Sequence, residues 1–200
     1  MPTGGRLEAT ILAGGAGARF GGAKLLSPWR GGRLIDGALG AAFAAPARTV
    51  SVVTGADPAV AGAARAWARS RGEEDRLRLV HAHDHAEGMG ASLRAAIASL
   101  PVDAAGAFVF LGDMPAIPRA VLPALAAAVE AGAVAAAPVF DGRRGHPVLF
   151  ARSLFERLAR ATGDEGARRV LADLDQALAL VETDDPGVLF DVDRGEPHHR

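Results

Sequence analysis

The chain reads Ala9-Thr10-Ile11-Leu12-Ala13-Gly14-Gly15-Ala16-Gly17-Ala18-Arg19-Phe20-Gly21-Gly22-Ala23-Lys24, a short apolar run followed by a glycine-rich segment with two cationic side chains. The run predicts a buried strand over 9–13. Glycine lets backbone amides converge on an anion, Arg19 can fork onto phosphate oxygens, and Lys24 adds a mobile point charge. The segment therefore predicts a site for nucleotide phosphates, with a merely flexible surface loop as the alternative.

Outward from this segment, short apolar runs alternate with longer helical patterns. The expected strands are 9–13, 49–54, 77–82, 107–111, 133–140, 146–150, 179–182 and 188–192, and the expected helices are 34–45, 59–69, 91–100, 118–131, 152–161 and 166–174. Such a βαβα rhythm predicts an α/β fold, a three-layer α/β/α sandwich with a Rossmann-like, mostly parallel sheet. The turn-rich segment 141–145 suggests a hairpin and hence a late antiparallel strand.

Composition narrows the class of protein. With 200 residues, 50% of them hydrophobic, we expect one domain over 1–200 with its core at about 8–193. A formal net charge of -1 gives no electrostatic footprint for nucleic acid or an anionic membrane, and the lack of cysteine excludes disulfides and thiolate sites. Residues 1–8 lack the pattern of a secretion signal, so a cytoplasmic location is expected.

Two common phosphate-binding patterns do not fit the glycine-rich segment. The dinucleotide pattern requires glycine three residues after Gly17, where Phe20 stands, and the P-loop pattern requires Ser or Thr after Lys24, where Leu25 stands. Neither a dinucleotide fingerprint nor a P-loop is therefore predicted.

An aspartate follows the apolar strand expected over 107–111. The segment Gly112-Asp113-Met114-Pro115 places a short, hard carboxylate at the end of the sheet where ligands of such folds bind. Asp113 is predicted to hold magnesium that bridges phosphate oxygens, with an ordinary strand-ending turn as the alternative. Near the end of the chain, Asp191 and Asp193 lie one residue apart on an expected strand. We favour Asp193 over Asp191 as a second metal ligand, with solvated acids as the alternative.

Three further segments suggest contacts with substrates. Gly88 and Ser92, in 87–94, open a helix whose amides can face a nucleotide, although an ordinary helix start explains the glycines nearly as well. In 142–150, Arg144 and His146 lie on the expected hairpin, where the cation can hold a second phosphate and the histidine can equally be a turn residue. Asp164 either contacts that substrate or caps the helix expected from Gly166.

The histidines at 81, 83 and 85 alternate with other residues and invite a zinc interpretation. Alternate residues of a strand face one way, but no Glu or Cys completes a tetrahedral set nearby, so solvated or strand-edge histidines are preferred.

These motifs together resemble the MobA-like family of nucleotidyltransferases. Its signature reads Leu-Ala-(Ala/Gly)-Gly, then Arg, a bulky apolar residue, Gly and Lys, matched by 12–24, and its Gly-Asp-x-Pro segment is matched by 112–115. The stretches 87–93, 145–148 and 163–168 resemble the Glu-Gly-Met-x-x-Ser-Leu, Gly-His-Pro-Val and Gly-Asp-x-Gly-Ala-Arg segments of the molybdenum-cofactor cytidylyltransferase branch. The resemblance implies the nucleotide-diphospho-sugar-transferase type of fold.

The resemblance also implies a reaction, the transfer of CMP from CTP to the molybdopterin cofactor with release of pyrophosphate, with magnesium as cofactor. The residues expected to act in catalysis are Arg19, Lys24 and Asp113, and the metal ligands are Asp113 and Asp193. Nucleotide contacts are expected from Leu12, Ala13, Gly14, Gly15, Gly17, Arg19, Lys24, Gly88, Ser92 and Asp113, and acceptor contacts from Arg144, Gly145, His146 and Asp164. A molybdoenzyme or its insertion chaperone is the expected protein partner.

One departure from the branch concerns the nucleotide. Leu12-Ala13-Gly14-Gly15 has glycine where the cytidylyltransferase branch usually has alanine, and so resembles the guanylyltransferase branch, which makes GTP the alternative substrate. The chain also resembles relatives of the nicotine blue oxidoreductase type, which implies an NAD(P)H-dependent oxidoreductase as the rival class. A catalytically weak chaperone that binds the cofactor is the third alternative.

Overall fold

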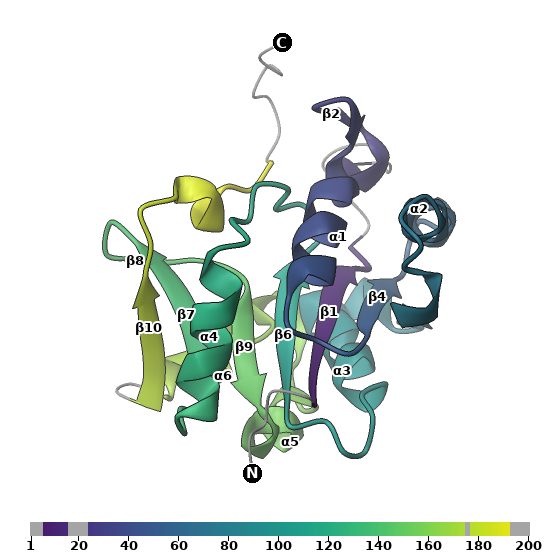
Figure 1. The fold of residues 1–200 in the computed structure, drawn as a ribbon. Coiled ribbons are helices and arrows are strands. Elements are labelled where there is room, and N and C mark those ends of the chain that lie inside the picture. The colour runs from purple at the N-terminus through teal and green to yellow at the C-terminus, as the bar shows by residue number, and fades with distance from the viewer. Residues whose placement is uncertain (1–5, 16–23, 175–176, 193–200) are drawn as a thin grey trace.

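A mixed sheet forms the centre of the computed structural model, which describes residues 6–15, 24–174 and 177–192 (Figure 1). Its strands lie in the order β10-β7-β9-β6-β1-β4-β5, and β8 pairs with β7 outside this path. The strands are β1 (Leu7–Ala13), β4 (Val50–Thr54), β5 (Leu77–His81), β6 (Gly106–Leu111), β7 (Ala135–Phe140), β8 (Arg143–Arg144), β9 (Val148–Ala151) and β10 (Leu178–Glu182). A separate short hairpin is formed by β2 (Pro28–Trp29) and β3 (Gly32–Arg33).

Helices cover both faces of the sheet. They are α1 (Leu34–Ala44), α2 (Ala59–Arg69), α3 (Met89–Ala98), α4 (Val121–Glu130), α5 (Phe155–Leu158) and α6 (Arg168–Ala172). Helices α1 and α4 lie in front of the sheet in Figure 1, and α3, α5 and α6 lie behind it. This is the three-layer α/β sandwich that the sequence predicts, and the α/β prediction is confirmed.

Alternation along the central strands builds the two hydrophobic layers. Ile11 and Phe110 pack with α1, α2 and α4 in one buried cluster. Val109, the neighbour of Phe110, faces the other side and packs with Leu93 of α3 and with α5 and α6. Because successive side chains of a strand point to opposite faces, an almost continuously apolar strand such as β6 is buried on both sides.

Parallel pairing brings the functional ends of the strands together. β1 pairs in parallel with both β4 and β6, so that Ala13 lies opposite Thr54 and Leu12 lies opposite Leu111. The carboxyl ends of these strands, and of β5 beyond β4, therefore meet at one edge of the sheet. Residues that follow each strand are neighbours in space although they are far apart in the chain.

The expected late antiparallel strand is also confirmed. β9 lies between β6 and β7 and runs antiparallel to both. Asp141 and Gly142 form a two-residue turn between β7 and β8. Their φ angles of 49° and 69° are both left-handed, as a type I′ hairpin turn requires at its two central positions.

The prediction of a strand over 188–192 is wrong. Residues Pro186–Leu189 form a 3-10 helix, in which the side chain of Asp185 accepts a hydrogen bond from the Gly187 amide at 2.8 Å. Proline has no amide hydrogen to give to a sheet, and the capping aspartate favours a turn, so the local apolar pattern is overridden. The helix expected over 152–161 is shortened to a 3-10 turn, Arg152–Leu154, followed by α5, and the one expected from Gly166 begins at Arg168.

No helix of the described ranges is long and apolar enough to cross a membrane.

The opposite end of β1 carries a buried carboxylate. Glu8 is 1% exposed and accepts hydrogen bonds from Arg48 Nε at 2.7 Å and from the Thr49 amide and hydroxyl at 3.1 and 2.7 Å. Arg48 also reaches the exposed Asp103, and these contacts raise the pKa of the guanidinium. Glu8 thus ties the start of β1 to the segment before β4 at the end of the sheet remote from Asp113.

Replacing Glu8 by alanine leaves Arg48 without its buried partner. We expect the free energy of unfolding of Glu8→Ala, measured by urea denaturation, to fall by about 3 kcal/mol. Asp103→Ala is the control, and its effect is expected to be small because exposed ion pairs contribute little. Equal losses for the two variants would contradict this account of β1.

Candidate active site

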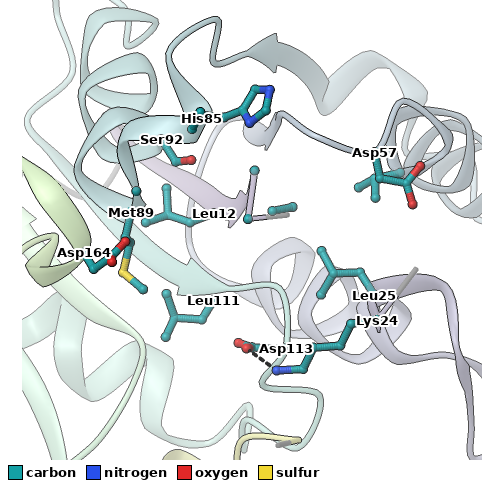
Figure 2. Close-up of a pocket in the computed structure, with 16 residues that line it drawn as sticks. Leu12, Lys24, Leu25, Asp57, His85, Met89, Ser92, Leu111, Asp113 and Asp164 are labelled. Carbon is teal, nitrogen blue, oxygen red and sulfur yellow. Dashed lines mark hydrogen bonds and ion pairs between the residues drawn. The ribbon is translucent and has the colours of Figure 1, made fainter. Parts of the chain in front are cut away.

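A cavity of about 370 Å³ opens at the carboxyl ends of β1, β5 and β6 (Figure 2). Leu12 and Ala13 end β1, Gly14 and Gly15 follow, and all four line the cavity as expected of nucleotide contacts. Lys24 begins a 3-10 helix, Lys24–Leu26, on another wall. Gly17 and Arg19 lie outside the described residues.

The first cavity has an ion pair at its edge. Lys24 Nζ donates to Asp113 Oδ2 at 2.8 Å, and the side chains are 13% and 33% exposed. Asp113 follows β6, so its carboxylate lies at the carboxyl end of the strand, as predicted. Lys24 reaches this carboxylate from another wall of the cavity (Figure 2). Two of the predicted catalytic residues are therefore in direct contact.

Ser92 forms part of the floor of this cavity. Its side chain is buried on α3, and a Cβ built on Gly14 would lie 2.4 Å from Ser92 Oγ. Ser92 Oγ thus occupies the space that a methyl group on residue 14 would take. Ser92 and Gly88 both line the cavity, as the sequence predicts.

A second cavity of about 410 Å³ adjoins the first. Arg144, Gly145 and His146, the expected acceptor contacts, line it. Arg143 and Arg168 add further cationic side chains. Four residues line both cavities, namely Leu12, Met89, Leu111 and Asp113. Asp113 therefore stands at the boundary between the two.

The β7–β8 hairpin is fixed against the last described segment of the chain. His146 N donates to Val188 O at 2.8 Å, and a Cβ on Gly145 would meet the same oxygen at 2.3 Å. Gly145 thus permits a close approach of two backbones, which holds the arginines of β8 at the rim of the second cavity.

His146 has an enclosed, unpaired ring nitrogen. Its Nδ1 has no hydrogen-bond partner among the described residues. Burial lowers the pKa of His146 to about 4, against the opposing effects of a hydrogen bond to the Val109 backbone and the charge of Asp113, while Arg144 and Arg168 lower it further. The imidazole is therefore neutral at physiological pH.

Asp164 was expected among the acceptor contacts, which line the second cavity, but it lines the first. It belongs to a 3-10 turn, Gly163–Glu165, and its side chain is on the wall of the first cavity (Figure 2). A Cβ on Gly88, which has φ of 101°, would lie 2.3 Å from Asp164 Oδ1. The residue does not cap a helix, because α6 begins at Arg168 with Ala167 as its N-cap.

The end of the described chain passes beside Asp113. Val192 N donates to the Asp113 carbonyl at 3.1 Å, and the Phe190 ring contacts Trp29 with centroids 5.5 Å apart. Asp191 lines the second cavity with Asp113, although the strand assumed for it is absent. Asp193, the favoured second metal ligand, lies outside the described residues.

Several residues that line the first cavity were not predicted from the sequence, among them Asp57, His85 and Met89. Asp57 follows β4, and the end of this strand at the shared edge of the sheet was the available signal. The three histidines lie close together: the ring centroid of His81 is 4.9 Å from that of His83 and 6.2 Å from that of His85. Within the part of the chain that the structure describes, no group of three or more His, Asp or Glu residues can hold a metal.

Residues 9–178 match the model of the MobA-like NTP transferase domain. The chain belongs to this family. The resemblance found in the sequence is thereby confirmed, and the family supports a transferase. Family membership leaves the substrates open, since the known relatives of this MobA-like protein differ in function.

Two curated relatives span nearly the whole MobA-like chain. Nicotine blue oxidoreductase of Paenarthrobacter nicotinovorans is 31% identical over 198 residues, covering 95% of this chain and 93% of that protein. Molybdenum cofactor cytidylyltransferase of Escherichia coli (strain K12) is 23% identical over 195 residues, covering 94% and 91%.

Solved structures share the MobA-like fold. Rv0371c of Mycobacterium tuberculosis H37Rv superposes with a TM-score of 0.72 at 24% identity, covering 90% of this chain and 89% of that one. Molybdopterin-guanine dinucleotide biosynthesis protein A of Archaeoglobus fulgidus gives 0.60 at 19% identity, covering 92% and 91%. A further structure of Rv0371c is described as a complex with manganese.

The buried imidazole of His146 predicts a pH dependence of stability. A histidine of the unfolded chain titrates near pH 6.5, so between about pH 6.5 and 4 the unfolded state binds more protons than the native state. The free energy of unfolding should fall as the pH falls through this window, by at most about 1.4 kcal/mol per pH unit from this residue, with no contribution above it.

Urea denaturation at several pH values tests this dependence. In His146→Phe the fall between pH 6.5 and 4 should be shallower than in the wild type, whereas His83→Phe, which alters an exposed ring, should keep the wild-type slope. Identical slopes for all three proteins would mean that His146 is not held neutral.

Proposed function

We propose that the protein is a magnesium-dependent nucleotidyltransferase that transfers CMP from CTP to the terminal phosphate of the molybdopterin cofactor and releases pyrophosphate. One observation carries the proposal: Asp113 lines both cavities, with Gly14, Gly15 and Lys24 on one side and cationic side chains on the other. A donor triphosphate and an acceptor phosphate bound in the two cavities meet at this carboxylate.

The reaction needs no protein nucleophile. An oxygen of the acceptor phosphate attacks the α-phosphorus of CTP, the bond to the bridging oxygen of the β-phosphate breaks, and pyrophosphate leaves with the bonding electrons. Positioning of the two phosphates and neutralisation of their charge supply the catalysis. Lys24 has three N–H donors, so it can keep Asp113 and still bind the departing pyrophosphate. We assign the same task to Arg19 and to the amides near Gly17.

The carboxylates at the boundary fit a hard divalent cation. Lys24 occupies one oxygen of Asp113, and the other accepts no hydrogen bond from the described residues. Asp191 lines the same cavity, and magnesium commonly takes one or two protein carboxylates together with substrate phosphates and water. We propose Asp113 with Asp191 or Asp193 as the ligands of the ion, which when bound would neutralise charge at the phosphate oxygens.

The second cavity suits an acceptor that carries a phosphate. Arg143, Arg144 and Arg168 present exposed guanidinium groups at its rim, and guanidinium forks match phosphate oxygens. His146 offers a neutral imidazole deeper in the cavity. These features support molybdopterin as the acceptor, with a molybdoenzyme or its insertion chaperone as the recipient of the product.

The choice between CTP and the alternative, GTP, turns on Gly14. Glycine at this position is typical of the guanylyltransferase branch, but here the space a methyl group would take is occupied by Ser92 Oγ. Gly14 therefore adds little room for a purine, which supports CTP.

Pyrophosphate release with molybdopterin as acceptor tests the proposal. We expect release with CTP to exceed release with GTP and to require both acceptor and magnesium. Asp113→Asn should lower kcat/KM at least about a hundredfold, the scale seen when a group that stabilises developing charge is removed. Asp141→Asn, an exposed turn carboxylate outside both cavities, is the matched control and should match the wild type. Undiminished turnover in Asp113→Asn would refute the role of the carboxylate.

A second candidate is an NAD(P)H-dependent oxidoreductase, favoured by the 31% identity to nicotine blue oxidoreductase. The same purified protein, given NADPH and a coloured electron acceptor, distinguishes the two. Oxidation of NADPH without release of pyrophosphate from CTP or GTP would replace the transferase proposal by the oxidoreductase.

A further inference from the structure

His85 lies on the wall of the first cavity, across from Lys24 and Asp113. It begins the 3-10 helix His85–Glu87 directly after β5 and lines the cavity beside Ala86 and Ser92. In Figure 2 the imidazole lies on the same side of the cavity as Ser92, and Lys24 and Asp113 lie on the other side. With the phosphates placed at Lys24 and Asp113 as proposed above, the side of the cavity with Ser92 and His85 is available to the base.

The packing around His85 fixes the ring. A Cβ built on Gly55 would lie 2.6 Å from His85 Cβ, 2.8 Å from His85 Cγ and 2.5 Å from Gly14 O. His85 Cβ and Cγ thus pack directly against the backbone of Gly55, which on the same side also approaches Gly14 O. The His81 ring lies nearby, with the two ring centroids 6.2 Å apart and the ring planes at 65°. A ring held in this way presents its nitrogens in a constant direction.

The Nδ1 atom of His85 is enclosed and has no hydrogen-bond partner in the described part of the chain. Leaving a buried polar atom unpaired costs about 1–3 kcal/mol, so native structures keep few of them. Of the four such side-chain atoms in the described residues, those of Thr10 and Asp36 lie outside both cavities, whereas His85 lines the first and His146 the second. Among the four, the nitrogens of His85 and His146 are therefore the ones that belong to a cavity wall, where a bound ligand is the available donor.

We infer that His85 is a specificity-determining residue that accepts a hydrogen bond from an exocyclic amino group of the nucleobase. In the tautomer with its proton on Nε2, an imidazole offers Nδ1 as an acceptor. Ser92 Oγ, which can donate or accept, lies on the same side of the cavity to complete recognition of the base. The inference rests on the proposed function only in taking a nucleoside triphosphate as the occupant, and it holds for either cytosine or guanine, both of which carry such an amino group.

Matched pairs of nucleotides isolate this hydrogen bond. CTP has an exocyclic amino group where UTP has a carbonyl. GTP has an exocyclic amino group that ITP lacks. Equilibrium binding of all four with magnesium is measured by calorimetry on the wild type, His85→Phe, His85→Asn and the control His83→Phe. Inorganic tripolyphosphate, which has no base, reports on the phosphate site and on correct folding of each variant.

We expect the wild type to bind the amino-bearing member of its preferred pair about tenfold more tightly, and His83→Phe to keep this ratio. In His85→Phe the ratio should fall to within about threefold while the affinity for tripolyphosphate stays unchanged. His85→Asn, whose amide oxygen can stand near the place of Nδ1, should recover part of the ratio.

A wild-type ratio that survives in His85→Phe would overturn the assignment of His85 and leave the transferase proposal intact. A loss of tripolyphosphate affinity equal to the loss for the nucleotide would also overturn it, because the residue would then act on the whole site. Failure of the wild-type protein to bind any of the four nucleotides would overturn both the inference and the proposed function.

Discussion

Asp113 joins three segments that are far apart in the chain. Its carboxylate accepts a hydrogen bond from Lys24, and its backbone carbonyl accepts one from Val192. The parallel pairing of β1 with β6 brings the start of the glycine-rich segment, at Gly14, and the end of β6 to one edge of the sheet. Because β9 runs antiparallel to β6, it begins at the edge where β6 ends, and the residues before it line the second cavity beside Asp113.

Glycine and histidine give the two cavities their separate characters. On the nucleotide side, Gly14, Gly55 and Gly88 bring Ser92, His85 and Asp164 against bare backbone, so polar atoms line a narrow space. On the acceptor side, Gly145 brings the hairpin against Val188, and exposed arginines surround a neutral His146. The first arrangement favours recognition of a nucleoside, and the second favours an anionic group beside an uncharged ring.

The sequence predicted those parts of the site that follow from strand order alone. Asp113, Lys24, Ser92 and His146 come directly after or between recognisable apolar runs, and the sheet edge then brings them together. Asp164 could not be placed in this way, because its position depends on left-handed glycines at 88 and 166 that interlock two loops. The segment 188–192 alternates like a strand, but Pro186 and the capping Asp185 turn it away, which is a local competition that hydrophobic pattern does not register.

The most direct test of the account is the shift in thermal midpoint caused by magnesium with CTP, GTP or NADPH, for the wild type and Asp113→Asn. A ligand that binds only the native state raises the midpoint, by roughly 5 °C or more for a domain of this size at a hundredfold excess over Kd. The account predicts a magnesium-dependent shift with CTP, or with GTP if the alternative holds, that is lost in Asp113→Asn. A shift with NADPH alone, or a nucleotide shift that persists without the Asp113 carboxylate, would contradict it.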